Sequence, residues 1–313
     1  MRRGIVVGRF LPPHAGHVLL CETATRLIDR LTILIHGRPD DTIPLATRAA
    51  WMTELFPAAR VIAHQEATAR PDWPAIVARH HPEPVDAVFA ADAGGERLAK
   101  ALGARPVTID PKRQAIPARS ADIRADPLAH WHHLPAPVRA HHARTICLHG
   151  PESTGKSTVA PRLAARFDTI VVPEYGRTYC EQHGLDLSMD DLVAIGKGHQ
   201  AMTEAALRQC GGRLILDTDP LMTAAWADML FGRRDPWFDA FTATADLYLL
   251  FDIDMPWVDD GTRFFGEPSQ RQRFFDISRA ELDRRGLPYA VIGGPAEGRY
   301  DKAVAAIEAA GLG

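Results

Sequence analysis

The sequence has little cysteine, no long apolar run and no excess of charge of either sign. Its four cysteines, Cys21, Cys147, Cys180 and Cys210, lie far apart and form no CxxC pair. This spacing predicts neither a disulfide framework nor a zinc knuckle. No stretch approaches the roughly 20 consecutive apolar residues that a membrane-spanning helix needs. We therefore expect free thiols and no insertion into a membrane.

Charge is nearly balanced, because 36 Lys and Arg against 39 Asp and Glu give a formal net charge of -3. This balance argues against a large positively charged surface that binds nucleic acid, so phosphate binding should come from specific sites. The chain runs from Met-Arg-Arg through the short apolar segment 4–8 into a Pro/His-rich turn, which is not a signal-peptide pattern. The histidine pairs at 80–81, 132–133 and 141–142 lack acidic partners, and we interpret them as exposed loop histidines rather than metal ligands. We expect a cytoplasmic protein that does not bind nucleic acid.

The length of 313 residues predicts two hydrophobic cores, and the pattern of apolar runs predicts an α/β fold for both. In the first half, strands are predicted at 4–8, 31–36, 60–64, 85–90 and 105–109, with helices at 16–29, 44–56 and 94–102. In the second half, strands are predicted at 145–149, 169–172, 213–217, 246–252 and 289–292, with helices at 155–167, 189–209, 220–230 and 300–310, the second capped by Ser188. Residues 125–144 carry three prolines and no period, which indicates a junction. The prediction is two parallel-sheet α/β domains, residues 1–140 and 141–313.

A Walker A pattern, GxxxxGK[ST], lies between a predicted strand and a predicted helix of the second half. Glycines at both ends let backbone amides wrap a phosphate, and the helix start adds positive charge. Lys156 would reach the β and γ oxygens of ATP, and Ser157 would ligate Mg²⁺. The predicted ATP-binding residues are Gly150, Glu152, Ser153, Thr154, Gly155, Lys156, Ser157 and Thr158.

Acidic residues follow two predicted strands of the same half. Asp217 and Asp219 end an apolar strand; we assign Asp217 to the magnesium ion and Asp219 to catalysis, although either could equally be a helix cap. Glu174 follows another strand, at the edge where α/β sheets place substrates, and could accept a hydroxyl proton. The alternative for Glu174 is an ion pair with Arg177.

Residues 259–273 are polar, contain glycine and carry three arginines, a composition typical of a mobile lid. Arg263, Arg271 and Arg273 could close over the phosphoryl group during its transfer, because the transition state spreads negative charge over the oxygens of that group. We assign Arg263 to catalysis and Arg271 to ATP. The alternative is a solvated arginine face.

The segment GRFLPPHAGH follows the first strand and opens a helix. His14 and His17, three positions apart across a glycine, could both donate to the triphosphate of ATP and stabilise charge as pyrophosphate leaves. Gly8, Arg9 and Phe10 complete this predicted binding turn. The alternative is a pair of loop histidines.

At these residues the sequence resembles the NadR-type bifunctional family, which joins nicotinamide-nucleotide adenylyltransferase to ribosylnicotinamide kinase. The segments that carry the resemblance are GRFLPPHAGH, residues 110–113 leading to 123–127, then GPESTGKST, PEYGR, LDTD and residues 256–263. The resemblance implies a Rossmann-like nucleotidyltransferase domain followed by a P-loop kinase domain. Longer members carry an N-terminal helix-turn-helix domain, whereas this chain starts on the first transferase strand, so DNA binding is not implied.

The resemblance implies two steps of NAD salvage. The kinase would move the γ-phosphoryl of ATP to the 5′-hydroxyl of nicotinamide riboside. The transferase would join the resulting nicotinamide mononucleotide to AMP from ATP, giving NAD and pyrophosphate. By position, His14, His17 and Arg124 would hold ATP in the first domain.

A nicotinamide ring is flat, and cationic in the riboside, so we expect an aromatic side chain against it. Trp257 is our first choice because it follows a strand end and precedes the lid. Tyr175 and Trp237 are the alternatives. Tyr175 and Asp259 are also assigned to the substrate site.

The sequence departs from the family pattern just before Arg124. Where the family resembles I/V-S-G/A-T-x-I-R, residues 118–124 read ARSADIR, so hydroxyls have moved or gone, and Arg119 could substitute for them. A second family segment, S-E-x-Y-G, reads ADAGG at 91–95. We expect weakened adenylyl transfer. The alternatives are a kinase with a scaffold or nucleotide-sensing first domain, and a sensor that acts through a partner; a homo-oligomer is compatible with all of them.

Overall fold

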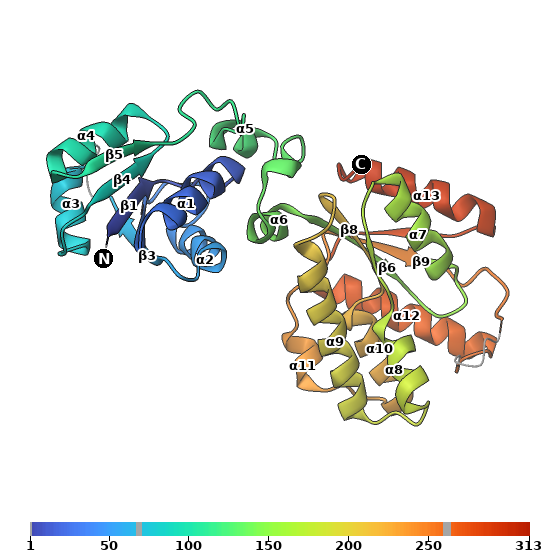
Figure 1. Ribbon diagram of the computed structural model, residues 1–313. Coiled ribbons are helices and arrows are strands. Elements are labelled where there is room, and N and C mark those ends of the chain that lie inside the picture. The colour runs from blue at the N-terminus through green and yellow to red at the C-terminus, as the bar shows by residue number, and fades with distance from the viewer. Residues whose placement is uncertain (1, 67–70, 259–263) are drawn as a thin grey trace. The chain divides into compact units, whose positions relative to one another are not determined.

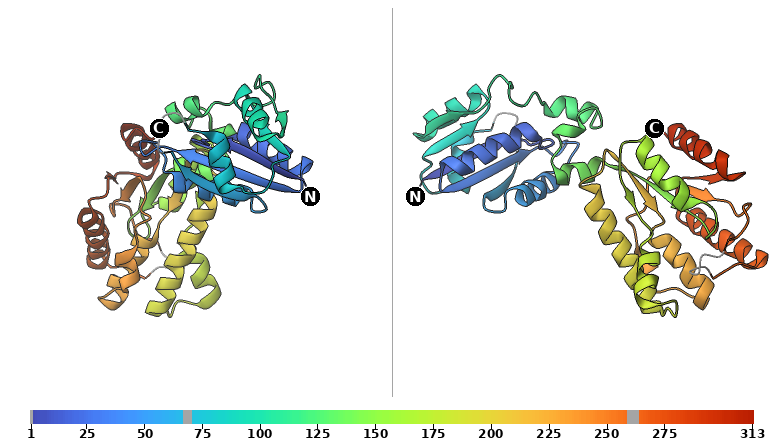
Figure 2. Two further views of the ribbon diagram at one scale, coloured as in Figure 1. Left: turned by 90° about the vertical axis from the view of Figure 1, so that its left-hand side faces the viewer. Right: turned by 45° about the vertical axis from the view of Figure 1, so that its right-hand side comes forward.

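The computed structural model describes residues 2–66, 71–258 and 264–313. Contacts within the chain divide it into two compact units, residues 1–141 and 142–313. Each unit has a five-stranded, all-parallel sheet with helices against it (Figures 1 and 2). The predicted α/β fold class is therefore confirmed.

The first unit has its sheet in the order β3-β2-β1-β4-β5. The strands are β1 (Arg3–Gly8), β2 (Arg30–Gly37), β3 (Arg60–Gln65), β4 (Ala87–Ala90) and β5 (Arg105–Thr108). The helices are α1 (Ala15–Leu27), α2 (Leu45–Leu55), α3 (Trp73–His80), α4 (Ala93–Leu102), α5 (Ser120–Ala125), the 3₁₀ turn η1 (Trp131–His133) and α6 (Ala136–His142). Successive side chains of β1 lie on opposite faces of the sheet: Val6 packs with α1 and α2, and Ile5 packs with α3 and α4. The strand order reverses between β1 and β4, where open α/β sheets bind ligands.

The segment that follows β5 packs on the first unit. Leu134 and Val138 are 2% and 0% exposed, and they share a hydrophobic cluster with Leu11 and Trp51. The boundary between the units, after residue 141, falls inside the predicted junction 125–144, but most of this segment packs on the first unit instead of forming a linker. The helices here have six, three and seven residues, so none is long enough to show a helical period in the sequence.

Residues 1–141 and 142–313, expressed separately, are each expected to unfold in one cooperative transition, because each keeps its own sheet and core. A fragment of residues 1–125 is the contrast. It lacks Leu134 and Val138, each worth about 1.5–3 kcal/mol of burial, and should have a lower midpoint in urea. Circular dichroism during urea titration measures both. A molten 1–141 fragment, or equal midpoints for the two N-terminal fragments, would contradict this account.

The second unit has its sheet in the order β10-β9-β6-β8-β7. The strands are β6 (Arg144–His149), β7 (Val171–Val172), β8 (Arg213–Asp217), β9 (Leu247–Phe251) and β10 (Tyr289–Ile292). The helices are α7 (Lys156–Arg166), α8 (Tyr175–His183), α9 (Met189–Leu207), α10 (Pro220–Phe231), α11 (Pro236–Ala240), α12 (Pro268–Arg285) and α13 (Ala296–Ala309). Helices α7 and α13 contribute Leu163 and Ile307 to one core cluster with the sheet. Because β8 pairs directly with β6, the Walker A loop and Asp217 lie at the same edge of the sheet.

Every strand and helix predicted from the sequence is present, with shifted ends. Ser188 caps α9 as predicted: its Oγ accepts the Asp191 N–H, and the Asp191 carboxylate accepts the Ser188 N–H. Helix α12 starts at Pro268, so the second part of the predicted lid is helical rather than mobile. The four cysteines are free thiols, as predicted. Within the described ranges, no helix is both long and apolar enough to cross a membrane.

Candidate functional site

The Walker A loop of the second unit has a backbone shape that depends on its glycines. Gly150 has φ +118°, and a Cβ atom there would lie 2.7 Å from the Phe251 carbonyl oxygen; Gly155, directly before α7, has φ +88°. Lys156 is 8% exposed, and its Nζ donates to the carbonyl oxygens of Gly150 at 2.8 Å and Pro151 at 2.7 Å. The loop thus places a buried ammonium group at the N-terminal end of a helix, an arrangement suited to phosphate.

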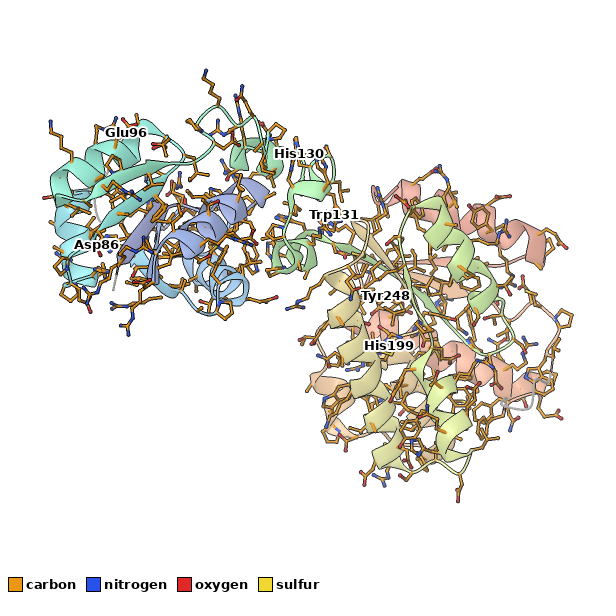
Figure 3. All side chains as sticks on the ribbon, viewed as in Figure 1. Asp86, Glu96, His130, Trp131, His199 and Tyr248 are labelled. Carbon is orange, nitrogen blue, oxygen red and sulfur yellow. The ribbon has the colours of Figure 1, made fainter. Side chains whose placement is uncertain are left out.

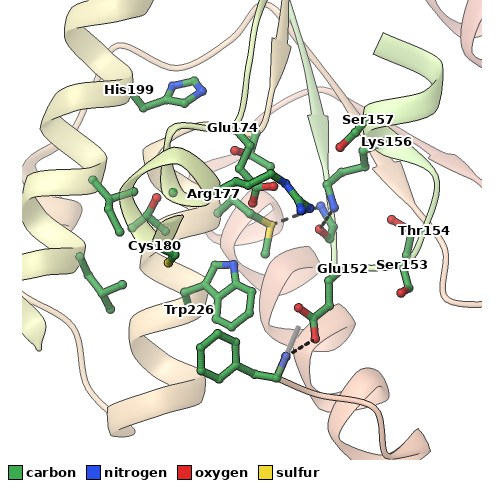
Figure 4. Close-up of a pocket in the computed structure, with 18 of the residues that line it drawn as sticks. Glu152, Ser153, Thr154, Lys156, Ser157, Glu174, Arg177, Cys180, His199 and Trp226 are labelled. Carbon is green, nitrogen blue, oxygen red and sulfur yellow. Dashed lines mark hydrogen bonds between the residues drawn. The ribbon is translucent and has the colours of Figure 1, made fainter. Parts of the chain in front are cut away.

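A pocket opens beside this loop, between the β7–α8 turn and helices α9 and α10 (Figure 4). All the predicted ATP-binding residues of the loop line it. Its other lining residues include the polar Glu174, Arg177 and His199 and the apolar Leu192, Trp226 and Phe264. His199 is 2% exposed, and burial lowers its pKa to about 4, so the imidazole is neutral. One end of the pocket therefore suits phosphate, and the other suits a flat organic group.

Two carboxylates flank the buried ammonium. Glu174 occupies the N-cap position of α8. Burial raises the pKa of Glu174, the nearby Asp217 and Glu152 act in the same direction, and Lys156 and Arg177 oppose them. Burial lowers the pKa of Lys156, against the effect of Glu174, Asp217 and Glu152. The sequence-predicted Lys156, Glu174 and Asp217 therefore come together around one site.

The predicted magnesium ligands, Ser157 and Asp217, offer a suitable donor set. Asp217 is 5% exposed, and its buried Oδ1 has no hydrogen-bond partner among the described residues. Ser157 is exposed in the first turn of α7 and lines the pocket. Carboxylate and hydroxyl oxygens are hard ligands of the kind that Mg²⁺ takes, so these residues fit the ion.

Asp219, assigned to catalysis from the sequence, is placed differently. Its Oδ1 accepts the N–H groups of Leu221 at 3.0 Å and Met222 at 3.2 Å, and its Oδ2 accepts the Tyr248 hydroxyl at 2.6 Å. Burial raises the pKa of Asp219 to about 6, against these hydrogen bonds. Asp219 is the N-cap of α10 and does not line the pocket. This geometry corresponds to the capping alternative.

The three arginines of the predicted lid have separate positions. Arg271 is 9% exposed; its Nη1 donates to the Met255 carbonyl at 3.0 Å, while its buried Nε and Nη2 have no partner within the described residues. Arg273 is exposed on the outer face of α12. Arg263 lies outside the described residues, as does Asp259. Arg271 does not line the pocket, so its assignment to ATP stays a prediction.

The Walker A loop also holds the segment that leads into α12. Glu152 Oε1 accepts the Phe264 N–H at 2.9 Å (Figure 4). It also accepts the Phe265 N–H at 2.7 Å. Ser153 Oγ exchanges hydrogen bonds with the Val258 backbone, each 3.1 Å long. Glu152 therefore faces the backbone of the pocket wall as well as the phosphate loop.

The aromatic residue that lines the pocket is not the one chosen from the sequence. Trp257 is absent from the lining, and its ring lies against Gly266. Tyr175 packs on Gly198 of α9. Trp226 of α10 lines the pocket with Phe264, their ring centroids 5.5 Å apart.

Sequence reasoning missed Trp226, although one signal was present. Met222 and Trp226 are four residues apart in α10 and both line the pocket. In a helix this spacing puts two side chains on one face. The helix begins directly after the strand that carries Asp217, so its first turns were candidates for the wall of the site.

The HxGH turn of the first unit is a capping box made of two histidines. His14 Nδ1 accepts the Gly16 N–H at 3.1 Å, and His17 Nδ1 accepts the His14 N–H at 3.3 Å. Burial lowers the pKa of His14 to about 4 and that of His17 well below its ordinary value. Both imidazoles are thus neutral, and because each Nδ1 accepts, each Nε2 carries the proton. The N-terminus of α1 therefore carries two ring N–H donors.

The neighbouring residues mainly shape this turn. Gly8 ends β1, and a Cβ there would lie 3.0 Å from the ring of Phe10, which is 1% exposed. Arg9 pairs with Asp41. Arg124 Nη1 donates to the Leu11 carbonyl. The first unit thus brings His14, His17, Arg9 and Arg124 to one end of β1.

The altered segment before Arg124 is accounted for by local contacts. Ser120 Oγ donates to the Pro12 carbonyl at 3.2 Å, and Ala118 is 2% exposed in the cluster with Leu11. Arg119 is exposed, and its side chain makes no capping hydrogen bond to α5. The hydroxyl that remains in this segment is therefore engaged with the turn.

Fold and site together define a two-unit α/β protein whose second unit carries a P-loop nucleotide site. A family described as "AAA domain" matches residues 145–299. The chain is 28% identical to the "Trifunctional NAD biosynthesis/regulator protein NadR" of Escherichia coli (strain K12) over 319 residues, covering 91% of this chain and 77% of that protein. The protein of the same name from Salmonella typhimurium is 27% identical with the same coverage.

Two solved structures share the fold over the whole chain. "Crystal structure of NadR protein in complex with NR" has a TM-score of 0.80 at 24% identity, and the complex with NAD and AMP-PNP has a TM-score of 0.77 at 21% identity. Each covers 100% of this chain and 97% of the other. The chain is a homologue of the NadR proteins, and the resemblance found in its sequence is confirmed.

Proposed function

We propose that the second unit is a kinase that transfers the γ-phosphoryl of ATP to the 5′-hydroxyl of nicotinamide riboside. Homology to NadR supports an enzyme of NAD metabolism of the kinase or transferase type. The observation that carries the proposal is that Lys156, Glu174 and Asp217 converge beside the Walker A loop. Lys156 and the loop amides would stabilise the charge on the transferred group.

In the proposed step, the 5′-oxygen bonds to the γ-phosphorus, the bond to the β-phosphate oxygen breaks, and ADP leaves. Glu174 takes the hydroxyl proton, and its raised pKa makes it a stronger base than an ordinary carboxylate. Ser157 and Asp217 would hold Mg²⁺, which when bound supplies charge neutralisation between the β and γ phosphates. The products are ADP and nicotinamide mononucleotide.

For the other end of the substrate, Trp226 and Phe264 provide an aromatic wall. A cationic pyridinium is attracted to such a ring face. Glu174, Glu152 and Asp217 add negative potential nearby, which also favours a cation over a neutral ring. The wall thus suits the nicotinamide ring of the riboside.

A direct test is ADP release from ATP with nicotinamide riboside as the acceptor. The proposal expects release that saturates with riboside and yields one mononucleotide per ADP. A chain that binds ATP but forms no ADP with the riboside would contradict it and would favour a sensing role.

Changing Trp226 to Ala is expected to raise the KM for nicotinamide riboside about 5–30-fold, because loss of a desolvated cation–π contact costs about 1–2 kcal/mol. Steady-state kinetics at saturating ATP measures this. Trp226 also packs on Phe265 and Phe274, so Trp226→Phe, which keeps a ring, should restore most of the affinity.

The matched control is Trp257→Ala, because the ring of Trp257 lies outside the pocket lining. It should leave the riboside KM unchanged. If Trp257→Ala raises KM and Trp226→Ala does not, the first choice made from the sequence is right and Trp226 is wrong.

The first unit is proposed to transfer the adenylyl group of ATP to nicotinamide mononucleotide. The observation that favours this is the pair of Nε2–H donors of His14 and His17 at the N-terminus of α1, next to the switch between β1 and β4. Such donors can stabilise departing pyrophosphate without a covalent intermediate. Formation of NAD from mononucleotide and ATP tests this step, and none at all would favour a scaffold or nucleotide-sensing unit.

A further inference from the structure

A buried arginine of α13, Arg299, lies beside the Walker A loop. Helix α13 packs beside α7, the helix that begins at this loop, and side chains of both helices meet in one core cluster (Figures 1 and 3). Arg299 is 1% exposed. Its Cδ atom lies 4.0 Å from the position that a Cβ atom would take at Gly155, the N-cap of α7. A guanidinium group removed from water is costly unless its donors are paired, so its partners show what it holds in place.

The guanidinium group of Arg299 binds backbone carbonyls from three segments. Its Nη1 donates to the carbonyl oxygen of Thr154, in the Walker A loop, at 3.1 Å. The same nitrogen donates to Asp252, directly after β9, at 3.0 Å and to Ile292, the last residue of β10, at 3.2 Å. Its Nε donates to the Gly294 carbonyl at 2.9 Å. Arg299 therefore ties the phosphate loop to the carboxyl ends of two strands.

One carboxylate accompanies this buried cation. Asp254 pairs with Nη2 of Arg299, and its other oxygen accepts the Gly294 N–H. The side chain of Asp254 is 40% exposed, whereas that of Arg299 is 1% exposed. The ion pair thus has its carboxylate near the surface and its guanidinium group inside, where the backbone carbonyls are the other acceptors.

A contact that fixes the Thr154 carbonyl also fixes the amide that follows it. The peptide group is planar and trans, so its C=O and N–H point in opposite directions. The hydrogen bond that turns the Thr154 carbonyl towards Arg299 therefore turns the Gly155 N–H away from Arg299. Gly155 lines the pocket, and its φ of +88° belongs to a region that glycine enters easily and also leaves easily. An external contact is what keeps this amide in one direction.

We propose that Arg299 is a positioning residue of the kinase site, which holds the Thr154–Gly155 peptide so that the Gly155 N–H faces a nucleotide phosphate. The inference rests on the proposed function of this loop as an ATP site. Arg299 does not line the pocket, so it acts through the peptide and not by contact with ATP. Lysine cannot replace it, because the acceptors are reached from three separate nitrogen atoms, whereas an ammonium group has one.

Hydrogen–deuterium exchange of the whole chain, read by mass spectrometry over peptides from residues 150–158, tests the inference without catalysis. Arg299→Lys should speed exchange in this loop. Lys302→Ala is the matched control, because Lys302 is exposed on the same helix and donates to the Gly293 carbonyl at 2.6 Å, in the loop after β10. It should leave exchange in the Walker A loop at the wild-type rate. Equal exchange in this loop for Arg299→Lys and the wild type would overturn the inference.

Kinase assays give the second readout. Arg299→Lys should raise the KM for ATP about tenfold or more, as expected when a hydrogen bond to a charged group is lost. The KM for nicotinamide riboside at saturating ATP should stay unchanged. A role in stability alone would lower Tm and leave the KM for ATP at the wild-type value. Absence of ADP formation in the wild type would refute the proposed function instead, and the exchange experiment would then decide on Arg299.

If Arg299→Lys does not fold, Asp254→Asn takes its place, because this change at a partly exposed side chain removes the charge that pairs with Arg299. Loop exchange and the KM for ATP should move in the same direction as in Arg299→Lys, by a smaller amount. Unchanged exchange together with an unchanged KM in Asp254→Asn would overturn the inference.

Discussion

Replacing Lys156 with Ala is expected to lower kinase turnover by about 10²–10³-fold or more, because a buried, preorganised donor to the transferred phosphoryl is lost. The ammonium group already lies at the Walker A loop, 2.7–2.8 Å from two of its carbonyl oxygens. An Ala side chain removes the hydrogen bonds to these carbonyls and the positive charge that Lys156 places near Glu174 and Asp217. ADP release with nicotinamide riboside measures the effect.

Lys197→Ala is the matched control, because Lys197 is exposed on α9 of the same unit. It should keep turnover at the wild-type value. NAD formation by the first unit should survive in Lys156→Ala, since the hydrogen bonds of Lys156 stay within the second unit. Turnover close to wild type in Lys156→Ala would sink the kinase assignment.

Glu174→Gln is expected to reduce kinase turnover by about 10²–10⁴-fold, the usual contribution of a positioned general base. In the wild type, kcat/KM should fall as pH decreases through the pKa of Glu174, which lies above its ordinary value. The Gln variant should lack this acidic limb. Glu181→Gln, an exposed change on the same helix, should keep both the rate and the profile.

Stability separates a lost base from a damaged fold. A carboxyl whose pKa is raised in the folded state binds protons more tightly there, so its contribution to stability is lost as pH rises through the raised pKa. Removing the charge should therefore leave Tm unchanged or higher at neutral pH. A Glu174→Gln protein with low activity and a clearly lower Tm would point to a structural role.

The strands could be read from the sequence because parallel strands are buried on both faces and appear as continuous apolar runs. The Walker A loop could also be predicted from the sequence, because its glycines and Lys156 form a short contiguous pattern whose conformation depends on the local backbone. Helix α12 was not predicted, because its arginines and glutamines resemble a lid and its buried face is marked by a few residues such as Phe274 and Leu282.

Only those features of the site that depend on residues adjacent in the sequence could be predicted. Asp219 precedes Pro220, which is the N-cap and N1 pattern of a helix start, so its capping role was readable. The choice between Trp226 and Trp257 was not, because proximity to a lid in sequence does not say which way a ring points.

The Glu152 carboxylate accepts backbone N–H groups from the aromatic wall while belonging to the phosphate loop. Glu152 therefore connects the part of the site proposed for ATP with the part proposed for the riboside. Linkage makes such an arrangement reciprocal: whatever ATP adds to the affinity for riboside, the riboside must add to the affinity for ATP. Neither affinity can then be tuned in isolation, and a substitution at position 152 would change the cooperativity of the pair rather than the binding of one partner.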